Sequence, residues 1–141
     1  FRSNKNKIMK EKKIYNNPRI IVIQKLYSYF LNKNSVIDYP KHRYKKFIKD
    51  TVSGTIEREE FLLEKLKEIL KNEFIPSRTD LILRIMILSA TFELIFVHKT
   101  PINVVVSEYV KISDFFLENA HKGYLNAILD KVSKNVRKDN D

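Results

Sequence analysis

The chain has 141 residues, of which 43% are hydrophobic and 11% aromatic, so it is long enough to bury one core without disulfides or metals. It has no cysteine and only two glycines, which excludes disulfide frameworks, thiolate metal sites, cysteine nucleophiles and glycine-built phosphate loops. The 27 Lys and Arg exceed the 17 Asp and Glu, for a net charge of +10, and this favours a polyanionic partner.

The positive charge is concentrated in the first third of the chain. Residues 1–49 hold 14 Lys and Arg against Glu11 and Asp38, a balance of +12, and residues 50–141 hold 13 against 15, a balance of −2. A lysine-rich genome that places lysine on every surface is the alternative, but it does not explain an acidic remainder. We therefore expect the surface that faces the polyanion to be built mainly from the first third.

The first half of the chain predicts a basic arm followed by helices. Residues 1–17 are polar and Lys-rich, so we expect an arm of which only the end is ordered. Asn17 and Pro18 are typical of a helix start, because the amide caps the helix and the proline lacks only a donor that the first turn does not use. Apolar residues at three- and four-residue steps predict a helix over 18–32. After a loop over 33–39, we expect a short helix that ends near Gly54.

The second half predicts further helices with clear starts. The pattern indicates a helix over 61–70, and then a break at Pro76. Thr79 and Asp80 are expected to cap a buried helix over 81–97, and Thr100 with Pro101 repeats the start signal for a helix over 102 to about 117. The chain re-enters a helix near Lys122 and continues to about Arg137.

The expected fold class is therefore all-α. Alternating apolar residues over 104–106 leave a short strand open as an alternative, although the residues that follow keep the helical period. The apolar run over 81–97 is interrupted by Arg84 and Glu93, so it is too short and too polar to cross a bilayer. No secretory signal pattern is found at the start, and we expect a cytoplasmic protein without a membrane association.

Four motifs occur in a fixed order along the chain. They are Arg19, Gln24, Leu26 and Tyr27 in the first helix; Leu88-Ser89-Ala90-Thr91-Phe92-Glu93-Leu94; Thr100-Pro101 with Val104-Val105-Val106-Ser107-Glu108; and Gly123-Tyr124-Leu125-Asn126-Ala127-Ile128-Leu129-Asp130-Lys131. Each motif alone is common, but the four in register resemble the bacterial antitermination factors called N utilisation substance protein B (NusB). The resemblance covers about residues 18–137.

This resemblance implies a fold and a set of partners. The fold is two small packed helical bundles, here a single domain over 18–141 with subdomains of about 18–75 and 76–137, preceded by the basic arm 1–17. The implied function is that of a transcription antitermination factor. It binds single-stranded boxA-type RNA in ribosomal RNA leaders together with a small-subunit ribosomal protein (the NusE role), and then joins the transcription elongation complex. The implied protein is no enzyme and has no cofactor.

Several positions depart from the family pattern. Leu88 stands where the family usually has Arg, Ser107 where it has Asn, and Leu117 where a Gly often follows the helix. The family's Arg-rich cluster at the start is reduced to Arg19, with Lys10, Lys12 and Lys13 upstream. Lysine neutralises phosphate but lacks the bidentate, stacking guanidinium, so affinity for RNA should survive better than specificity.

Seven residues are candidates for the RNA-binding surface: Lys12, Lys13, Arg19, Gln24, Tyr27, Lys122 and Tyr124. Arg19 lies near a helix N-terminus, where the helix dipole disfavours a cation, and we expect it to serve a phosphate rather than the fold. Tyr124 is either a base-stacking residue or a core aromatic. Tyr27 is expected in the core, although its hydroxyl reaches the surface in the alternative interpretation. Deleting the arm should flatten the salt dependence of RNA binding.

Enzyme and metal interpretations find little support. His42, His98 and His121 are isolated in the sequence, and none is paired with another ligand at a helical spacing that suggests zinc. Three glutamates, at positions 57, 59 and 60, fall at a helix start, where acidic residues favour the helix dipole. Glu93 lies in the apolar helix, and we expect it to pair with a buried backbone donor or with a basic residue such as Arg84 or Lys99.

Two other functions remain as alternatives. The first is a NusB-like RNA-targeting domain of a ribosomal RNA methyltransferase; if residues 1–141 are the full chain, no cofactor domain follows and we expect the free-standing factor instead. The second is a helical interaction module without an RNA role. Salt-sensitive binding to a boxA-like oligonucleotide would separate this module from the RNA-binding interpretations.

Overall fold

The computed structural model describes residues 16–137, and in this part of the chain every regular element is helical. The α-helices are α2 (Pro18–Leu31), α3 (Lys45–Glu57), α4 (Glu59–Leu70), α5 (Leu81–Phe96), α6 (Ile102–Phe116) and α7 (Asn119–Val136), and two short 3₁₀ turns are η1 (Lys71–Glu73) and η2 (Pro76–Arg78). The all-α prediction is confirmed, and residues 104–106, where a strand remained an alternative, lie in α6.

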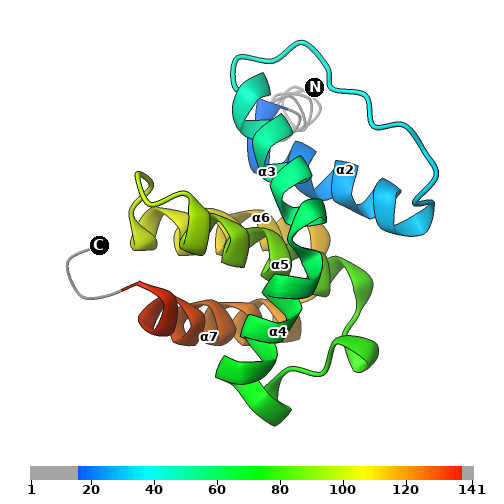
Figure 1. Ribbon diagram of the computed structural model, residues 1–141. Coiled ribbons are helices and arrows are strands. Elements are labelled where there is room, and N and C mark those ends of the chain that lie inside the picture. The colour runs from blue at the N-terminus through cyan, green and yellow to red at the C-terminus, as the bar shows by residue number, and fades with distance from the viewer. Residues whose placement is uncertain (1–15, 138–141) are drawn as a thin grey trace, which may run out of the picture.

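Helix α5 lies at the centre of the fold and packs against each of the other α-helices (Figure 1). Its sequence is apolar on nearly every face, which is typical of a helix surrounded by others. Its buried residues are Leu83, Ile85, Met86, Ile87, Leu88, Ser89, Ala90, Thr91, Phe92, Glu93 and Leu94. The prediction of a buried helix over 81–97 is therefore confirmed. No helix among the described residues is long and apolar enough to cross a membrane.

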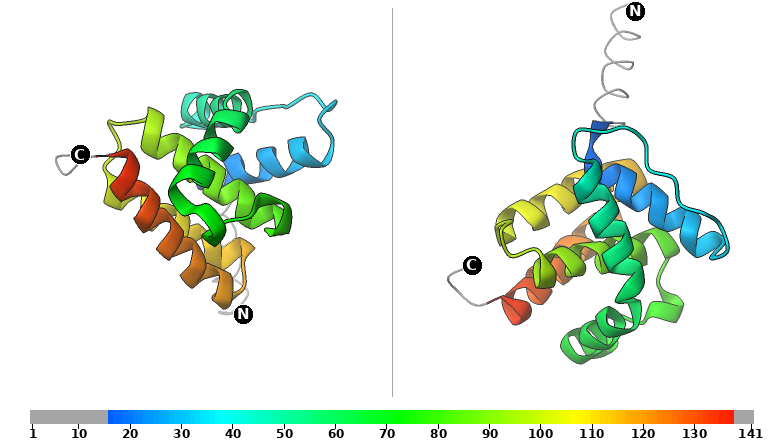
Figure 2. Two further views of the ribbon diagram at one scale, coloured as in Figure 1. Left: turned by 60° about the horizontal axis from the view of Figure 1, so that its bottom comes forward. Right: turned by 45° about the horizontal axis from the view of Figure 1, so that its top comes forward.

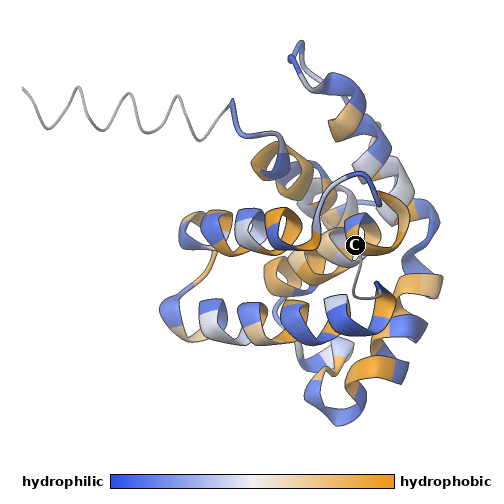
Figure 3. Ribbon diagram, turned by 90° about the vertical axis from the view of Figure 1, so that its left-hand side faces the viewer, coloured by the Kyte–Doolittle hydropathy of each residue, from blue (hydrophilic) through white to orange (hydrophobic). Residues whose placement is uncertain are grey.

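The other helices form two groups around α5. Helices α6 and α7 pack on α5 and on each other, and α2 packs on α3 across its other side. Helix α4 follows α3 after a bend at Arg58 and reaches down to contact α7 as well as α5 (Figures 1 and 2). Hydrophobic segments gather where the helices face one another, and hydrophilic segments lie outward (Figure 3).

Gly54 does not end its helix, so the expected boundary was wrong. Helix α3 continues through Gly54 to Glu57, and a Cβ atom at Gly54 would lie 2.2 Å from Cζ of Phe92 on α5. The glycine allows close approach of the two helices, and any larger residue there would collide with the ring.

The predicted helix starts are only partly correct. The Asn17 side chain accepts hydrogen bonds from the N–H groups of Arg19 and Ile20, at 3.0 and 3.4 Å, so that cap is confirmed. Asp80 is at the N-cap of α5 but its side chain makes no capping bond. Thr79 instead donates its hydroxyl to the carbonyl of Ile75. At α6 the N-cap position is occupied by Pro101, so the cap expected from Thr100 is absent.

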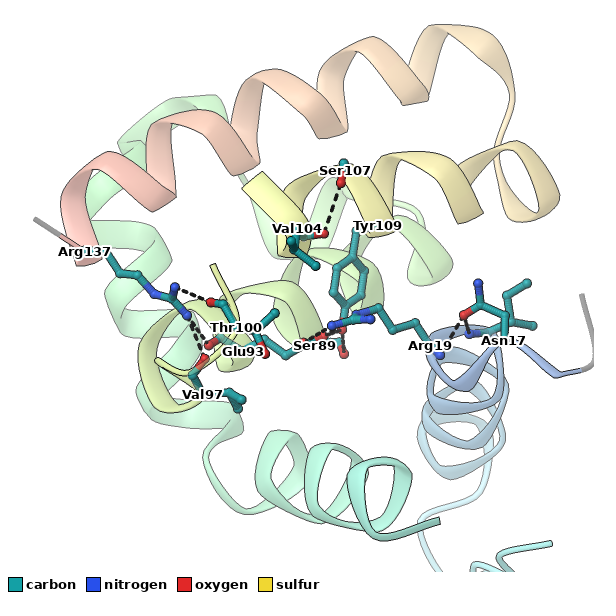
Figure 4. A network of polar contacts seen from close by, with 11 residues as sticks. Asn17, Arg19, Ser89, Glu93, Val97, Thr100, Val104, Ser107, Tyr109 and Arg137 are labelled. Carbon is teal, nitrogen blue, oxygen red and sulfur yellow. Dashed lines mark hydrogen bonds and ion pairs between the residues drawn. The ribbon is translucent and has the colours of Figure 1, made fainter. Parts of the chain in front are cut away.

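The C-terminal end of α5 is closed by a buried arginine from another helix. Arg137, which follows α7 and is 2% exposed, donates to the carbonyls of Leu94 at 2.7 Å and Val97 at 2.8 Å (Figure 4). It also donates to the carbonyls of Glu93 and Thr100. The guanidinium thus supplies donors to carbonyls at and just after the end of α5, where the carbonyl of Glu93 also accepts the N–H of Val97, and its charge favours the negative end of the helix dipole.

Candidate nucleic-acid interface

Arg19 projects from the first turn of α2 towards α5 and α6 rather than into solvent. Its Nε and Nη2 atoms donate to Oε2 and Oε1 of Glu93 at 3.0 and 2.6 Å, as a two-bond ion pair (Figure 4). The Tyr109 hydroxyl also donates to Oε2 of Glu93. Ser89 Oγ lies 2.6 Å from the Tyr109 hydroxyl. The Glu93 side chain is fully buried and that of Arg19 is 11% exposed.

The protonation states in this cluster follow from its burial. Burial, reinforced by the charge of Glu93, raises the pKa of Tyr109 well above its usual value, so the phenol stays neutral and donates. Because that single proton goes to Glu93, the hydroxyl of Ser89 must donate to Tyr109. Burial alone would lower the pKa of Arg19, but hydrogen bonding to Glu93 and its charge outweigh burial and raise it.

The guanidinium of Arg19 also stacks on aromatic rings. Its central carbon lies 4.9 Å from the centre of the Phe47 ring and 5.8 Å from that of Tyr109. These contacts join α2, α3, α5 and α6 at one point. In this structure Arg19 therefore serves the fold, contrary to our expectation of a phosphate-facing side chain, and its expected contact with RNA is untested.

Glu93 pairs with a basic residue as expected, but the two examples named for it, Arg84 and Lys99, were wrong. Arg84 donates to the carbonyl of Pro76 at 3.1 Å, and Lys99 is exposed in the turn after α5. The actual partner, Arg19, is 74 residues away in the sequence. Local spacing does not reveal such a pair, because the packing of α2 across α5 brings it together.

The two other candidates on α2 lie closer to the surface. Tyr27 is 37% exposed, so its expected place in the core was wrong, and Gln24 is half-buried three residues before it. Residues three apart on a helix share a face. Gln24 and Tyr27 thus offer an amide and a phenol on neighbouring positions. Lys12 and Lys13 lie outside the described residues.

Tyr124 joins α7 to the turn after α4 and is partly buried. Its hydroxyl donates to the carbonyl of Glu73 at 2.6 Å, and its ring packs against the core. Burial, with a smaller effect from Glu73, raises its pKa. Lys122, two residues earlier, forms an ion pair with Asp114 of α6 at 2.6 Å and is 38% exposed.

An open groove of about 320 Å³ borders Tyr124. Ile75 and Leu83 supply apolar wall, and Arg78 and His121 lie at its sides together with Asp80. A flat apolar ring beside a cation and polar side chains suits a nucleobase and its phosphate. The ring of Tyr124 is therefore both a packing residue and a wall of a groove.

The structure divides the predicted residues between separate elements. Arg19, Gln24 and Tyr27 lie on α2, whereas Lys122 and Tyr124 lie on α7. Within residues 16–137, no hydrogen bond or ion pair joins a candidate residue of α2 to one of α7. An RNA strand that touches both groups would have to extend over the surface between them.

The histidines and acidic residues do not form a metal site in the described part of the chain, where no cluster of three possible ligands occurs. His98 lies 2.6 Å from the carbonyl of Ile95, and His42 lies 2.8 Å from the carbonyl of Asn16. Glu59 and Glu60 occupy the first turn of α4 as predicted, whereas Glu57 is the last residue of α3, so its expected place at a helix start was wrong.

Sequence reasoning missed three features of this surface and its support. Tyr109 and Arg137 are buried polar residues whose partners come from distant helices, and no sequence signal identifies them. The third is a basic segment over 41–49, whose signal was present as a local run of Lys and Arg without an acidic residue.

The fold defines a small all-helical protein in which two groups of helices share one central apolar helix. The NusB family model matches residues 16–134, which is most of the chain. The chain therefore belongs to the NusB family, and the resemblance seen in the sequence motifs is confirmed.

Relatives and a solved structure agree with this assignment. The transcription antitermination protein NusB of Rickettsia massiliae (strain Mtu5) is 29% identical over 125 residues, which is 80% of this chain and 75% of that protein. The protein of the same name from Rhizobium meliloti (strain 1021) is 26% identical over 138 residues, 86% of each chain. The structure of T. maritima NusB superposes with a TM-score of 0.74 at 21% identity, covering 86% of this chain and 92% of that one, which supports the fold.

Proposed function

We propose that this protein is a transcription antitermination factor that binds a boxA-type single-stranded RNA together with a small-subunit ribosomal protein in the NusE role. The observation that carries the proposal is the match of the NusB family model over residues 16–134, because relatives in that family are named transcription antitermination proteins. The basic first third of the chain and the groove beside Tyr124 suit a single-stranded polyanion with exposed bases.

The proposed RNA surface has a stacking centre and electrostatic support. Tyr124 stacks on one base, and Lys122 contacts the neighbouring phosphate after exchanging its partner Asp114 for the RNA. Arg78 and His121 line the same groove. Gln24, Tyr27 and the basic arm with Lys12 and Lys13 contact the strand further along, whereas Arg19 supports the surface from below through Glu93.

The proposal is tested by titrating the protein with a boxA-like oligonucleotide and a scrambled one at several salt concentrations. Preferential binding of the boxA-like RNA, and co-purification with the ribosomal protein, are the expected results. Equal and weak binding of both RNAs, alone and with that ribosomal protein present, would contradict it.

Two variants of Tyr124 separate stacking from packing. Tyr124→Ala removes the ring and should weaken RNA binding by about 5- to 150-fold, the range for loss of base stacking. Tyr124→Phe keeps the ring and loses only the bond to Glu73, so it should cost about 1 kcal/mol of unfolding free energy and leave RNA affinity unchanged. If folded Tyr124→Ala bound RNA as tightly as Tyr124→Phe, Tyr124 would be a packing residue only.

A further inference from the structure

The segment from Lys41 to Lys49 carries a concentrated positive charge on the surface. It contains Lys41, Arg43, Lys45, Lys46 and Lys49 and no acidic residue. All five of these side chains are exposed. The segment comprises the end of the loop before α3 and the first turns of that helix (Figure 1). We call these residues the basic segment.

The charges of the basic segment do not stabilise the fold. Helix α3 begins at Lys45, its first turn has no acidic residue, and its N-cap residue Tyr44 makes no side-chain cap. A cation in this position opposes the helix dipole. Among the described residues, the segment has one ion pair, between Lys46 and Asp50 at 3.9 Å with both side chains exposed, and such a pair contributes little.

An aromatic residue stands among these charges. Tyr44 is 48% exposed, and the guanidinium carbon of Arg43 lies 5.4 Å from the centre of its ring. The His42 ring centre is 6.0 Å from that of Tyr44. An exposed ring with adjacent cations is the arrangement by which proteins hold single-stranded nucleic acid, since a base stacks on the ring while the cations contact phosphates.

A hydrogen bond fixes the basic segment beside the start of α2. Nε2 of His42 donates to the carbonyl of Asn16 at 2.8 Å, and Nδ1 of the same ring accepts the N–H of Tyr44 at 2.9 Å. Asn16 directly follows the stretch that contains Lys10, Lys12 and Lys13 in the sequence. The segment thus lies beside the residue at which the described part of the chain begins, directly after fifteen residues that are rich in Lys and Arg in the sequence.

We propose that the basic segment is a second contact site for single-stranded RNA, which binds nucleotides flanking the boxA-type element. Tyr44 stacks on a base, and Lys41, Lys45 and Lys49 neutralise phosphates. This inference rests on the proposed function. A membrane surface fits less well, because an interfacial helix needs an exposed apolar face. In α3, Ile48 and Val52 are buried in the core, and the other large apolar residues, Phe47 and Ile56, pack against it.

The test compares two kinds of RNA and two matched variants of the full chain. The RNAs are the boxA-like core alone and the core extended by uridines at either end. The first variant replaces Lys41, Lys45 and Lys49 with Gln. The control variant replaces Lys67, Lys99 and Lys134 with Gln, which removes the same charge from exposed lysines on other elements.

We expect extension at one end to raise the affinity of the unmodified protein and of the control variant. The first variant should bind the extended and core RNAs equally. Its salt slope on the extended RNA should be smaller by roughly 2, since each phosphate contact contributes about 0.7. Tyr44→Ala should weaken binding of the extended RNA by about 5- to 150-fold, and Tyr44→Phe should not.

Each other outcome overturns a different claim. If the unmodified protein fails to bind the core RNA, the proposed function fails. If it binds the core but extension has no effect, or affects both variants equally, the second site fails while the proposed function stands. If replacing Lys41, Lys45 and Lys49 with Gln abolishes binding to vesicles that contain anionic lipid, but the variant still binds the extended RNA more tightly than the core RNA, the segment faces a membrane and this inference is wrong.

Discussion

Two regions of this protein use positive charge in opposite ways. Around α5, the guanidinium groups of Arg19 and Arg137 lie in the interior, where they donate to a carboxylate and to carbonyl oxygens respectively. In the basic segment, Lys41 and Lys45 are exposed, and Lys45 lies in the first turn of α3, where the helix dipole disfavours a cation. The two regions differ in the side chain that carries the positive charge and in whether that side chain is paired within the protein. Planar arginine joins helices in the interior, whereas flexible lysine remains in solvent, where it can meet a polyanion.

The largest expected effect comes from breaking the buried pair. Arg19→Ala leaves the Glu93 carboxylate buried without its cation, and this should lower the free energy of unfolding by about 3–5 kcal/mol. Lys33→Ala is the matched control, because Lys33 pairs with Glu59 at 4.0 Å in a largely exposed position and should cost about 1 kcal/mol or less. Chemical denaturation measures both.

A double variant then tests whether Arg19 also contacts RNA. Arg19→Met with Glu93→Gln removes both charges and keeps an acceptor for Tyr109, so much of the stability should return. We expect RNA binding to return with it. Restored stability with weak RNA binding would mean that Arg19 meets the RNA directly, and the comparison between the two regions would fail at that residue.

An effect of intermediate size is expected in the pH dependence of stability, and it is caused by the ionisation of Tyr109. Its pKa is raised in the fold, so its contribution to stability is fully present below the ordinary tyrosine value of about 10 and is lost as pH rises above it. At neutral pH, Tyr109→Phe should cost about 1–3 kcal/mol, because the bond to Glu93 involves a charge. The difference in free energy of unfolding between the unmodified protein and Tyr109→Phe should decrease by up to about 1.4 kcal/mol per pH unit above pH 10.

Thermal unfolding of both proteins between neutral and strongly alkaline pH checks this expectation. Other groups titrate in the same range, but they are common to the two proteins and cancel in the difference. A gap that stayed constant throughout would mean that Tyr109 ionises equally in the folded and unfolded states.

The helices themselves were predictable from the sequence, because the apolar period and the capping residues of a helix lie within the helix or directly beside it. The apolar period located 18–31 and 81–96 within one or two residues, and the Asn17 cap was correct. The predicted end of α3 at Gly54 was wrong. The sequence does not distinguish a glycine that ends a helix from one that leaves room for an aromatic ring of a neighbouring helix.

The site was less predictable because its chemistry depends on contacts between distant segments. A lone Arg near a helix start suggested a phosphate ligand, yet the packing of α2 on α5 gives it a carboxylate 74 residues away. Tyr27 kept the helical spacing of a core residue but lies at the edge of the apolar face. The sequence does not decide whether Tyr124 stacks on a base or packs in the core. In the structure it lines a groove, and its hydroxyl donates to the carbonyl of Glu73.

The smallest expected effect is a gain in stability, whereas the single substitutions above are all expected to lower it. Lys45→Glu replaces a cation in the first turn of α3 with an anion, which should raise the free energy of unfolding by about 0.3–1 kcal/mol. Lys67→Glu makes the same change in the last turn of α4, where a cation is favourable, and should lower it by a similar amount.

The two variants should also differ in RNA binding, and this joins stability to function. Lys45→Glu should weaken binding of the extended RNA although the protein is more stable, and Lys67→Glu should leave it unchanged although the protein is less stable. A charge that disfavours its own helix and favours a ligand predicts this crossed pattern, whereas a charge that serves the fold predicts that both quantities fall together. If Lys45→Glu destabilised the protein as Lys67→Glu does, Lys45 would have a structural role, and the contrast between the interior and the basic segment would not hold there.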